Sequence, residues 1–193
     1  MLYSLLISAV IVTIAVLVGI YMFHTQIAYE SIRGAKVVIT GASMGIGAEI
    51  AKEYARLGAS EIVIASRSVD KLKGIKDSID AMGFNVTVHV VKADLSSRQA
   101  SEAMVQTSLE TMGSIDYLIL NHITSSRYGT WLVDNKNSAE GHSFVEEMFA
   151  VNTFSYIWSA NAVFDSMAAN PKGGAIGVVS SLAGWCSKVM LRC

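Results

Sequence analysis

The chain has 193 residues, with 15 basic and 16 acidic side chains and a formal charge of −1, so the sequence predicts no nucleic-acid partner. Hydrophobic residues make up 52% of the chain and charged residues 16%, which excludes a disordered polypeptide. Two cysteines exclude a disulfide-stapled scaffold and a four-cysteine zinc site, and we expect no metal centre.

An uncharged apolar run, Met1 to Phe23, opens the chain. As a helix it would be about 35 Å long, enough to cross a hydrocarbon core of about 30 Å. The alternative is a cleaved signal peptide, but no basic residue precedes the run and its apolar core is too long. We therefore expect a transmembrane anchor over residues 1–23, followed by a linker over residues 24–34. Arg33 and Lys36 follow the anchor, which weakly favours a cytosolic domain.

Strands and helices are expected to alternate after the linker. Short β-branched or apolar runs predict strands at 35–40, 61–65, 84–91, 115–120 and 174–180. Helical spacing of apolar residues predicts helices at 45–57, from a cap at Ser68 to 82, at about 97–111 and at 143–169. Such alternation is typical of an α/β protein with a Rossmann-type, doubly wound parallel sheet covered by helices on both faces.

A glycine-rich loop joins the first expected strand to the first expected helix. Glycines at this turn permit a tight bend, let the backbone approach a pyrophosphate and let the helix pack closely on the strand. The helix N-terminus then directs unpaired N–H groups at the phosphates. The loop predicts a nucleotide site made by Gly41, Ala42, Ser43, Met44, Gly45, Ile46 and Gly47; the alternative is a plain glycine turn.

Arg67 follows the second expected strand, where most NAD-binding folds place an acid that holds the ribose 2′-hydroxyl. Arginine cannot accept that hydrogen bond, but its fork of donors can pair with a 2′-phosphate. Ser43 and Ser68 could add hydroxyl groups. We therefore favour NADP(H) as the cofactor, the alternative being that Arg67 is an ordinary solvated charge.

With this loop, the chain resembles the short-chain dehydrogenase/reductase superfamily, whose cofactor motif has the spacing T-G-x-x-x-G-x-G. The resemblance covers about residues 34–184 and implies an NADP-binding domain over residues 35–184. It also implies cofactor contacts at Asp94 and Leu95 after the third strand, and at Asn121, His122 and Ile123 after the fourth. The last three resemble the subgroup of 11-beta-hydroxysteroid dehydrogenase type 1.

The resemblance also assigns part of a catalytic set. Asn152 matches the family's helix asparagine, which positions a water, and Ser181 matches the serine that polarises the substrate oxygen. The family's Tyr-x-x-x-Lys motif is absent, because none of the seven tyrosines has a lysine four positions later. Residues 185–193 diverge from the family. We expect the domain to be C-terminally incomplete and the 193-residue chain to be inactive by itself.

The subgroup implies a membrane-anchored enzyme of the endoplasmic reticulum that transfers hydride to or from a small lipophilic substrate, a steroid or lipid-like carbonyl or alcohol. It also implies a homodimer. It places the domain in the lumen, whereas Arg33 and Lys36 favour the cytosol, so the side of the membrane stays open. One alternative is a truncated, inactive form that binds nucleotide or regulates a full-length subunit. Another is a membrane-tethered scaffold that binds nucleotide without any reductase role.

Overall fold

The computed structural model describes residues 10–21, 32–124 and 145–181. The chain divides into two units, Met1–Arg33 and Gly34–Cys193, which are described separately. In the first unit, residues 10–21 form a helix with exposed side chains. Within the described ranges, no helix has both the length and the apolar character needed to cross a membrane. Residues 1–9 and 22–23 of the expected anchor, like the tail at 185–193, lie outside the described residues, so the anchor stays a prediction.

The second unit is built on a five-stranded sheet in the order β3-β2-β1-β4-β5. All four strand pairs are parallel, and the middle of β1 is in register with both neighbours, Val38 lying opposite Val63 and Leu118. The strands are β1 (Lys36–Thr40), β2 (Glu61–Ser66), β3 (Thr87–Lys92), β4 (Tyr117–Leu120) and β5 (Ala175–Val178). The parallel sheet predicted from the alternating pattern is confirmed.

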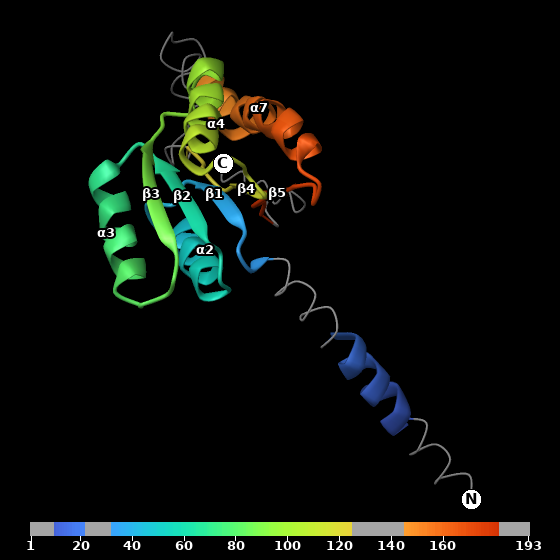
Figure 1. Cartoon of the computed structure of the whole chain (residues 1–193). Coiled ribbons are helices and arrows are strands. Elements are labelled where there is room, and N and C mark those ends of the chain that lie inside the picture. Colours follow the sequence, from blue (N-terminus) through green and yellow to red (C-terminus); the bar gives the residue numbers. More distant parts are fainter. Residues whose placement is uncertain (1–9, 22–31, 125–144, 182–193) are drawn as a thin grey trace, which may run out of the picture. The chain divides into compact units, whose positions relative to one another are not determined.

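Helices cover both faces of this sheet (Figure 1). The helices are α2 (Gly45–Arg56), α3 (Val69–Asp80), α4 (Arg98–Met112) and α7 (Ser155–Ala169), and a π-helical turn, η1 (Ala150–Phe154), precedes α7. One buried cluster joins the sheet to α2 and α3, through residues such as Ala51 and Leu72. A second cluster joins it to α4 and α7, through residues such as Met104 and Val163. The fold is therefore the doubly wound α/β class that the sequence predicts.

Some element ends differ from expectation by one or two residues, such as β4 beginning at Tyr117 and β5 ending at Val178. Three local expectations were wrong beyond this. The third strand begins at Thr87 rather than at residue 84, because Val86 N–H bonds back to the Phe84 carbonyl (2.9 Å) and the chain is not yet extended. Ser68 precedes α3 but its side chain does not cap the helix, since its backbone is not in the extended region that capping requires (φ −96°, ψ 85°). The helix expected over 143–169 is interrupted, within its described part, by the π-turn η1.

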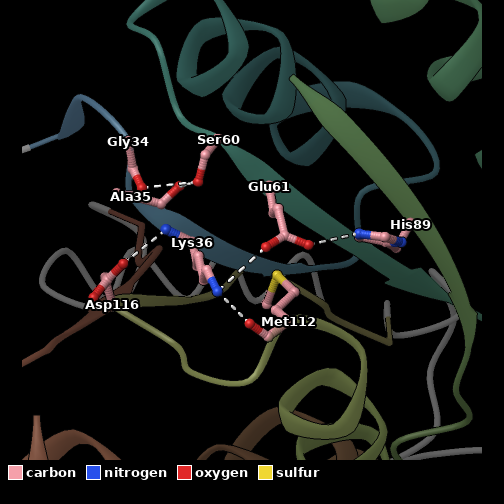
Figure 2. Close-up of polar contacts among 8 residues, drawn as sticks. All are labelled: Gly34, Ala35, Lys36, Ser60, Glu61, His89, Met112 and Asp116. Atoms are coloured by element: carbon pink, nitrogen blue, oxygen red, sulfur yellow. Dashed lines mark hydrogen bonds and ion pairs between the residues drawn. The ribbon is translucent and has the colours of Figure 1, made fainter. Parts of the chain in front are cut away.

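Charged side chains link the strands near their amino ends (Figure 2). Lys36 Nζ contacts Glu61 Oε1 (3.3 Å) and donates to the Met112 carbonyl, while its backbone N–H donates to Asp116 Oδ2 (2.8 Å). Glu61 Oε2 also lies 3.1 Å from His89 Nε2. This amino-end network, Lys36, Glu61, His89, Met112 and Asp116, ties β1 to β2, β3 and the connection between α4 and β4. It lies at the opposite end of the strands from the cleft described next.

Candidate functional site: a nucleotide cleft

A cleft of about 590 Å³ opens where the parallel strands end. The sheet order reverses between β1 and β4, and ligands of open α/β sheets bind outside the carboxyl ends of the strands at such a switch point. The cleft is lined by eleven of the residues predicted from the sequence, namely Gly41, Ser43, Met44, Ile46, Arg67, Ser68, Asp94, Leu95, Asn121, His122 and Ile123. The structure therefore brings together four loops that are far apart in the sequence.

The glycines of the first loop shape the cleft by close packing. A Cβ atom on Gly41 (φ +66°) would lie 2.7 Å from the Cα atom of His122, and one on Gly47 would lie 2.5 Å from the Gly41 carbonyl oxygen. Gly45 has room for a side chain but adopts φ +58°, which L-residues rarely adopt. Gly45, Gly47 and the buried Ala42 do not line the cleft. Gly47 allows close packing of the loop against Gly41 and Asn121.

A cationic corner is formed by the end of β2 and the start of α3. Arg67 and Lys71 are both exposed and both line the cleft, and no ion pair of either is present in the part of the chain that the structure describes. Ser68 lies between them, and its backbone N–H donates to Ser66 Oγ (3.1 Å). This corner can receive an anionic group without first breaking a salt bridge.

The loop after β3 supplies one acidic and one apolar residue. Asp94 is exposed, and its Oδ1 atom accepts a hydrogen bond from the Ser96 N–H (3.3 Å), an arrangement that fixes the turn. Leu95 is buried in the cluster that includes α4. Both residues line the cleft, and Leu95 also anchors the loop to the core.

Asn121 ties the end of β4 to the end of β1. Its side-chain amide donates to the carbonyl oxygens of Thr40 (3.4 Å) and Gly41 (3.3 Å), and its backbone N–H donates to Thr40 Oγ1 (3.0 Å). These bonds hold the glycine loop against the β4 loop, which positions the floor of the cleft.

The imidazole of His122 is buried between two hydroxyl groups, with the residue only 9% exposed. Nδ1 lies 2.7 Å from Thr40 Oγ1, and Nε2 lies 2.6 Å from Ser155 Oγ. Burial lowers the pKa of His122 from 6.5 to about 4, so the ring is neutral at pH 7. Ser155 Oγ donates to the Val151 carbonyl (2.6 Å), so it accepts from Nε2–H. Nδ1 then accepts from the Thr40 hydroxyl, which also lies within 3.2 Å of the Ile119 carbonyl, the longer of its two contacts.

The two residues assigned to catalysis lie outside the cleft lining. Asn152 belongs to η1, and its amide makes a reciprocal pair with the backbone of Thr124, accepting from N–H (2.8 Å) and donating to the carbonyl (3.0 Å). Ser181 is exposed and follows β5 by three residues. The catalytic roles of both stay predictions.

Comparison with known proteins identifies the family. The family model for short chain dehydrogenases matches residues 35–191. The chain belongs to this family. Hydroxysteroid 11-beta-dehydrogenase 1-like protein of Danio rerio is 36% identical over 155 residues, which cover 80% of this chain and 50% of that protein. The Homo sapiens protein of the same name is 34% identical over 154 residues, covering 80% and 45%. The chain thus spans about half the length of the curated relatives it matches.

Solved structures of short-chain dehydrogenases have the same fold. A metagenomic short-chain oxidoreductase in complex with NADP superposes with a TM-score of 0.68 and 33% identity, over 80% of this chain and 65% of that one. L-sorbose reductase of Gluconobacter frateurii, complexed with NADPH and L-sorbose, gives a TM-score of 0.67 and 28% identity, over 78% and 54%. Both neighbours were solved with an NADP-type nucleotide.

Sequence reasoning missed several residues of this short-chain dehydrogenase site. Five further residues line the cleft, namely Ala65, Ser66, Lys71, Ala93 and Val151. Of these, Lys71 had a signal in the sequence, because it is a cation at the start of the helix that follows Arg67. Thr40 and Ser155, which hold His122, had none, because isolated hydroxyl residues have no pattern that predicts a long-range contact.

Proposed function

We propose that this chain forms the cofactor-binding part of an NADP(H)-dependent oxidoreductase that is anchored in a membrane. The observation that carries the proposal is Arg67, a cation without an ion-pair partner among the described residues, at the carboxyl end of β2 and on the cleft. An acid at this place would select NAD, whereas an arginine suits the additional phosphate of NADP.

The residues of the cleft fit such a dinucleotide. Gly41 and Gly47 are positions where a Cβ atom would collide with backbone, so glycine is needed for the loop to fold as it does at the N-terminus of α2, where a pyrophosphate would bind. Arg67 and Ser68 would hold the 2′-phosphate, and Asp94 lines the cleft from the loop where the resemblance places adenine. When bound, the nicotinamide supplies or accepts the hydride.

The substrate class and the assembly are part of the same proposal. The named relatives are hydroxysteroid 11-beta-dehydrogenase 1-like proteins, which supports a steroid or lipid-like carbonyl or alcohol as substrate. In that reaction Asn152 positions a water and Ser181 polarises the substrate oxygen. The uncharged run at residues 1–23 supports a membrane anchor, and we extend the proposal to the endoplasmic reticulum and to a homodimer.

The cofactor assignment is tested by binding to the full chain in detergent. The change Arg67→Asp should weaken NADP⁺ binding by at least tenfold, because a bidentate pair with phosphate is replaced by repulsion, and should leave NAD⁺ binding equal or tighter. Lys172→Asp makes the same charge change at an exposed residue outside the cleft and should alter neither affinity. Equal NADP⁺ affinity in the Arg67 variant and the parent would overturn the assignment.

The oxidoreductase activity needs its own assay. The full chain is incubated with NADPH and a ketosteroid, and the loss of NADPH absorbance is followed. Turnover above a chain-free control supports the enzyme. A chain that binds NADP⁺ with the expected preference but never consumes NADPH would instead support the nucleotide-binding or regulatory form.

A further inference from the structure

Residues 85–87, Asn-Val-Thr, are the one match in the sequence to the acceptor pattern for N-linked glycans, Asn-x-Ser/Thr with x other than proline. The nucleotide cleft does not use this segment, because none of its three residues lines the cleft. The strand expected over residues 84–91 would place the asparagine inside a sheet, where a glycan could not be attached. The observed position of the asparagine therefore decides whether the pattern can function.

The structure places the acceptor asparagine outside the sheet. β3 begins at Thr87, and Asn85 is the middle residue of a three-residue turn that the Val86 N–H closes on the Phe84 carbonyl (2.9 Å). Asn85 and Thr87 are exposed, whereas Val86 between them packs against the buried cluster that joins the sheet to α2 and α3. Both side chains that the pattern requires are thus accessible, and the residue between them anchors the turn to the core.

The surroundings of Asn85 leave room for a bulky group. In the five-stranded sheet that the structure describes, β3 is the outer strand and pairs with β2 alone. Within the described ranges, neither the Asn85 amide nor the Thr87 hydroxyl makes a hydrogen bond, so a sugar on the amide would break no contact of the fold. Met82 and Phe84, in the same turn, are 46% and 37% exposed. A hydrophilic glycan beside them would shield this apolar surface from other molecules.

Asn85 also lies far from the nucleotide cleft. It precedes the amino end of β3, whereas the cleft opens at the carboxyl ends of the strands. β3 has six residues, which correspond to about 20 Å of strand. Thr87 lies opposite Glu61, a member of the amino-end network. A glycan at Asn85 would therefore leave the cleft open.

The side of the membrane determines whether a glycan can be added, because the transfer takes place in the lumen of the endoplasmic reticulum. Arg33 and Lys36 were the two cations that favoured the cytosol. Lys36 has a structural reason to be present, since its Nζ atom contacts Glu61 Oε1 (3.3 Å) and donates to the Met112 carbonyl. Arg33 is then the one charge left in favour of the cytosol, which makes that indication weaker still.

We propose that Asn85 carries an N-linked oligosaccharide and that the domain therefore lies on the lumenal side of the membrane. The donor is an oligosaccharide joined to a lipid pyrophosphate. Asn85 Nδ2 forms a bond to C1 of the first sugar, the bond from C1 to the pyrophosphate oxygen breaks, and the lipid pyrophosphate leaves with that electron pair. The amide releases one proton, and nothing is oxidised or reduced. The inference rests on the membrane anchor of the proposed function and is independent of the nucleotide assignment.

The test is synthesis of the full chain by cell-free translation with sealed microsomes of the endoplasmic reticulum. The parent chain should migrate one discrete step more slowly on a denaturing gel than the chain made without microsomes, and peptide N-glycosidase should remove that step. Asn85→Gln and Thr87→Ala each destroy the acceptor pattern and should lose the step completely. Thr87→Ser keeps the hydroxyl group and should keep the step in part or in full. The readout does not require a folded variant.

Asn161→Gln is the matched control. Asn161 is an exposed asparagine of α7 outside any acceptor pattern, so its replacement should leave the step intact. Protease added to the intact microsomes reports the side of the membrane independently of the glycan. The domain should be protected from digestion in the parent and also in the Asn85 variant, which has no glycan.

The outcomes separate this inference from the proposed function. A protected domain without a mobility step would refute the glycan and leave the lumenal anchor standing. A membrane-bound chain whose domain is digested would refute the inference but not the anchor. A chain that does not sediment with the microsomes would refute the anchor and this inference with it. A step that persists in the Asn85 variant would place the glycan elsewhere and overturn the assignment.

Discussion

Acidification should destabilise this domain through His122. The folded state holds the ring neutral, because burial lowers its pKa from 6.5 to about 4. Between these two values the unfolded chain binds more protons than the folded one, so stability is full above pH 6.5 and is lost as the pH falls towards 4. The free energy of unfolding falls by about 1.36 kcal/mol per pH unit between pH 6.5 and about 4, which amounts to about 3 kcal/mol. About 2 kcal/mol of this is lost by pH 5.

The assay is urea unfolding of the full chain at pH 7 and at pH 5. Tyr156 contacts the His122 ring (4.6 Å between centroids) and donates its hydroxyl to the His122 carbonyl, but burial raises its pKa above 10.0, so it does not titrate here. His122→Asn removes the titrating group and should lose about 2 kcal/mol less than the parent between the two pH values. Each protein is compared with itself at the two pH values, so any overall destabilisation of the variant cancels from the change in its free energy of unfolding. Equal losses in parent and variant would refute the reasoning.

Two further substitutions separate the roles of the two ends of the sheet. Gly47→Ala would place a Cβ atom 2.5 Å from the Gly41 carbonyl oxygen, so we expect about 1–3 kcal/mol of destabilisation in urea and at least tenfold weaker NADP⁺ binding. Glu61→Gln removes the charge that Lys36 and His89 share. It should cost about 1 kcal/mol in urea unfolding and leave NADP⁺ affinity unchanged; weakened binding would contradict this separation.

The sequence predicted the sheet well because each inner strand is a short apolar run buried on both faces. The second strand, expected at 61–65, is one residue longer, and β1 begins one residue later than expected, at Lys36. The third strand was misplaced at its start because Phe84 is apolar like a strand residue but lies in a turn, and only the backbone bond from Val86 shows this. Local apolar pattern thus predicts the centre of a strand better than its ends.

The site could be predicted where a single segment contains both a recognisable sequence motif and the groups that would contact the ligand. The glycine loop met this condition, and so did Arg67 at the end of β2. The network of Thr40, His122 and Ser155 did not, because its members come from β1, the β4 loop and the start of α7. Such contacts depend on tertiary packing, and a single sequence has no local signal for them.

Thr40 belongs both to the buried core and to the hydrogen-bond network that shapes the cleft. It is the last residue of β1, it is fully buried, and its hydroxyl oxygen contacts the Asn121 N–H (3.0 Å) and the His122 ring (2.7 Å). These contacts exist only in the observed register of β1 with β4, in which Val38 lies opposite Leu118. A slip of one residue would move the buried side chains of one strand to the opposite face of the sheet, where they do not fit the other core cluster, and would also move Asn121 away from the glycine loop. The hydrophobic burial that fixes the strands therefore also fixes the floor of the nucleotide cleft.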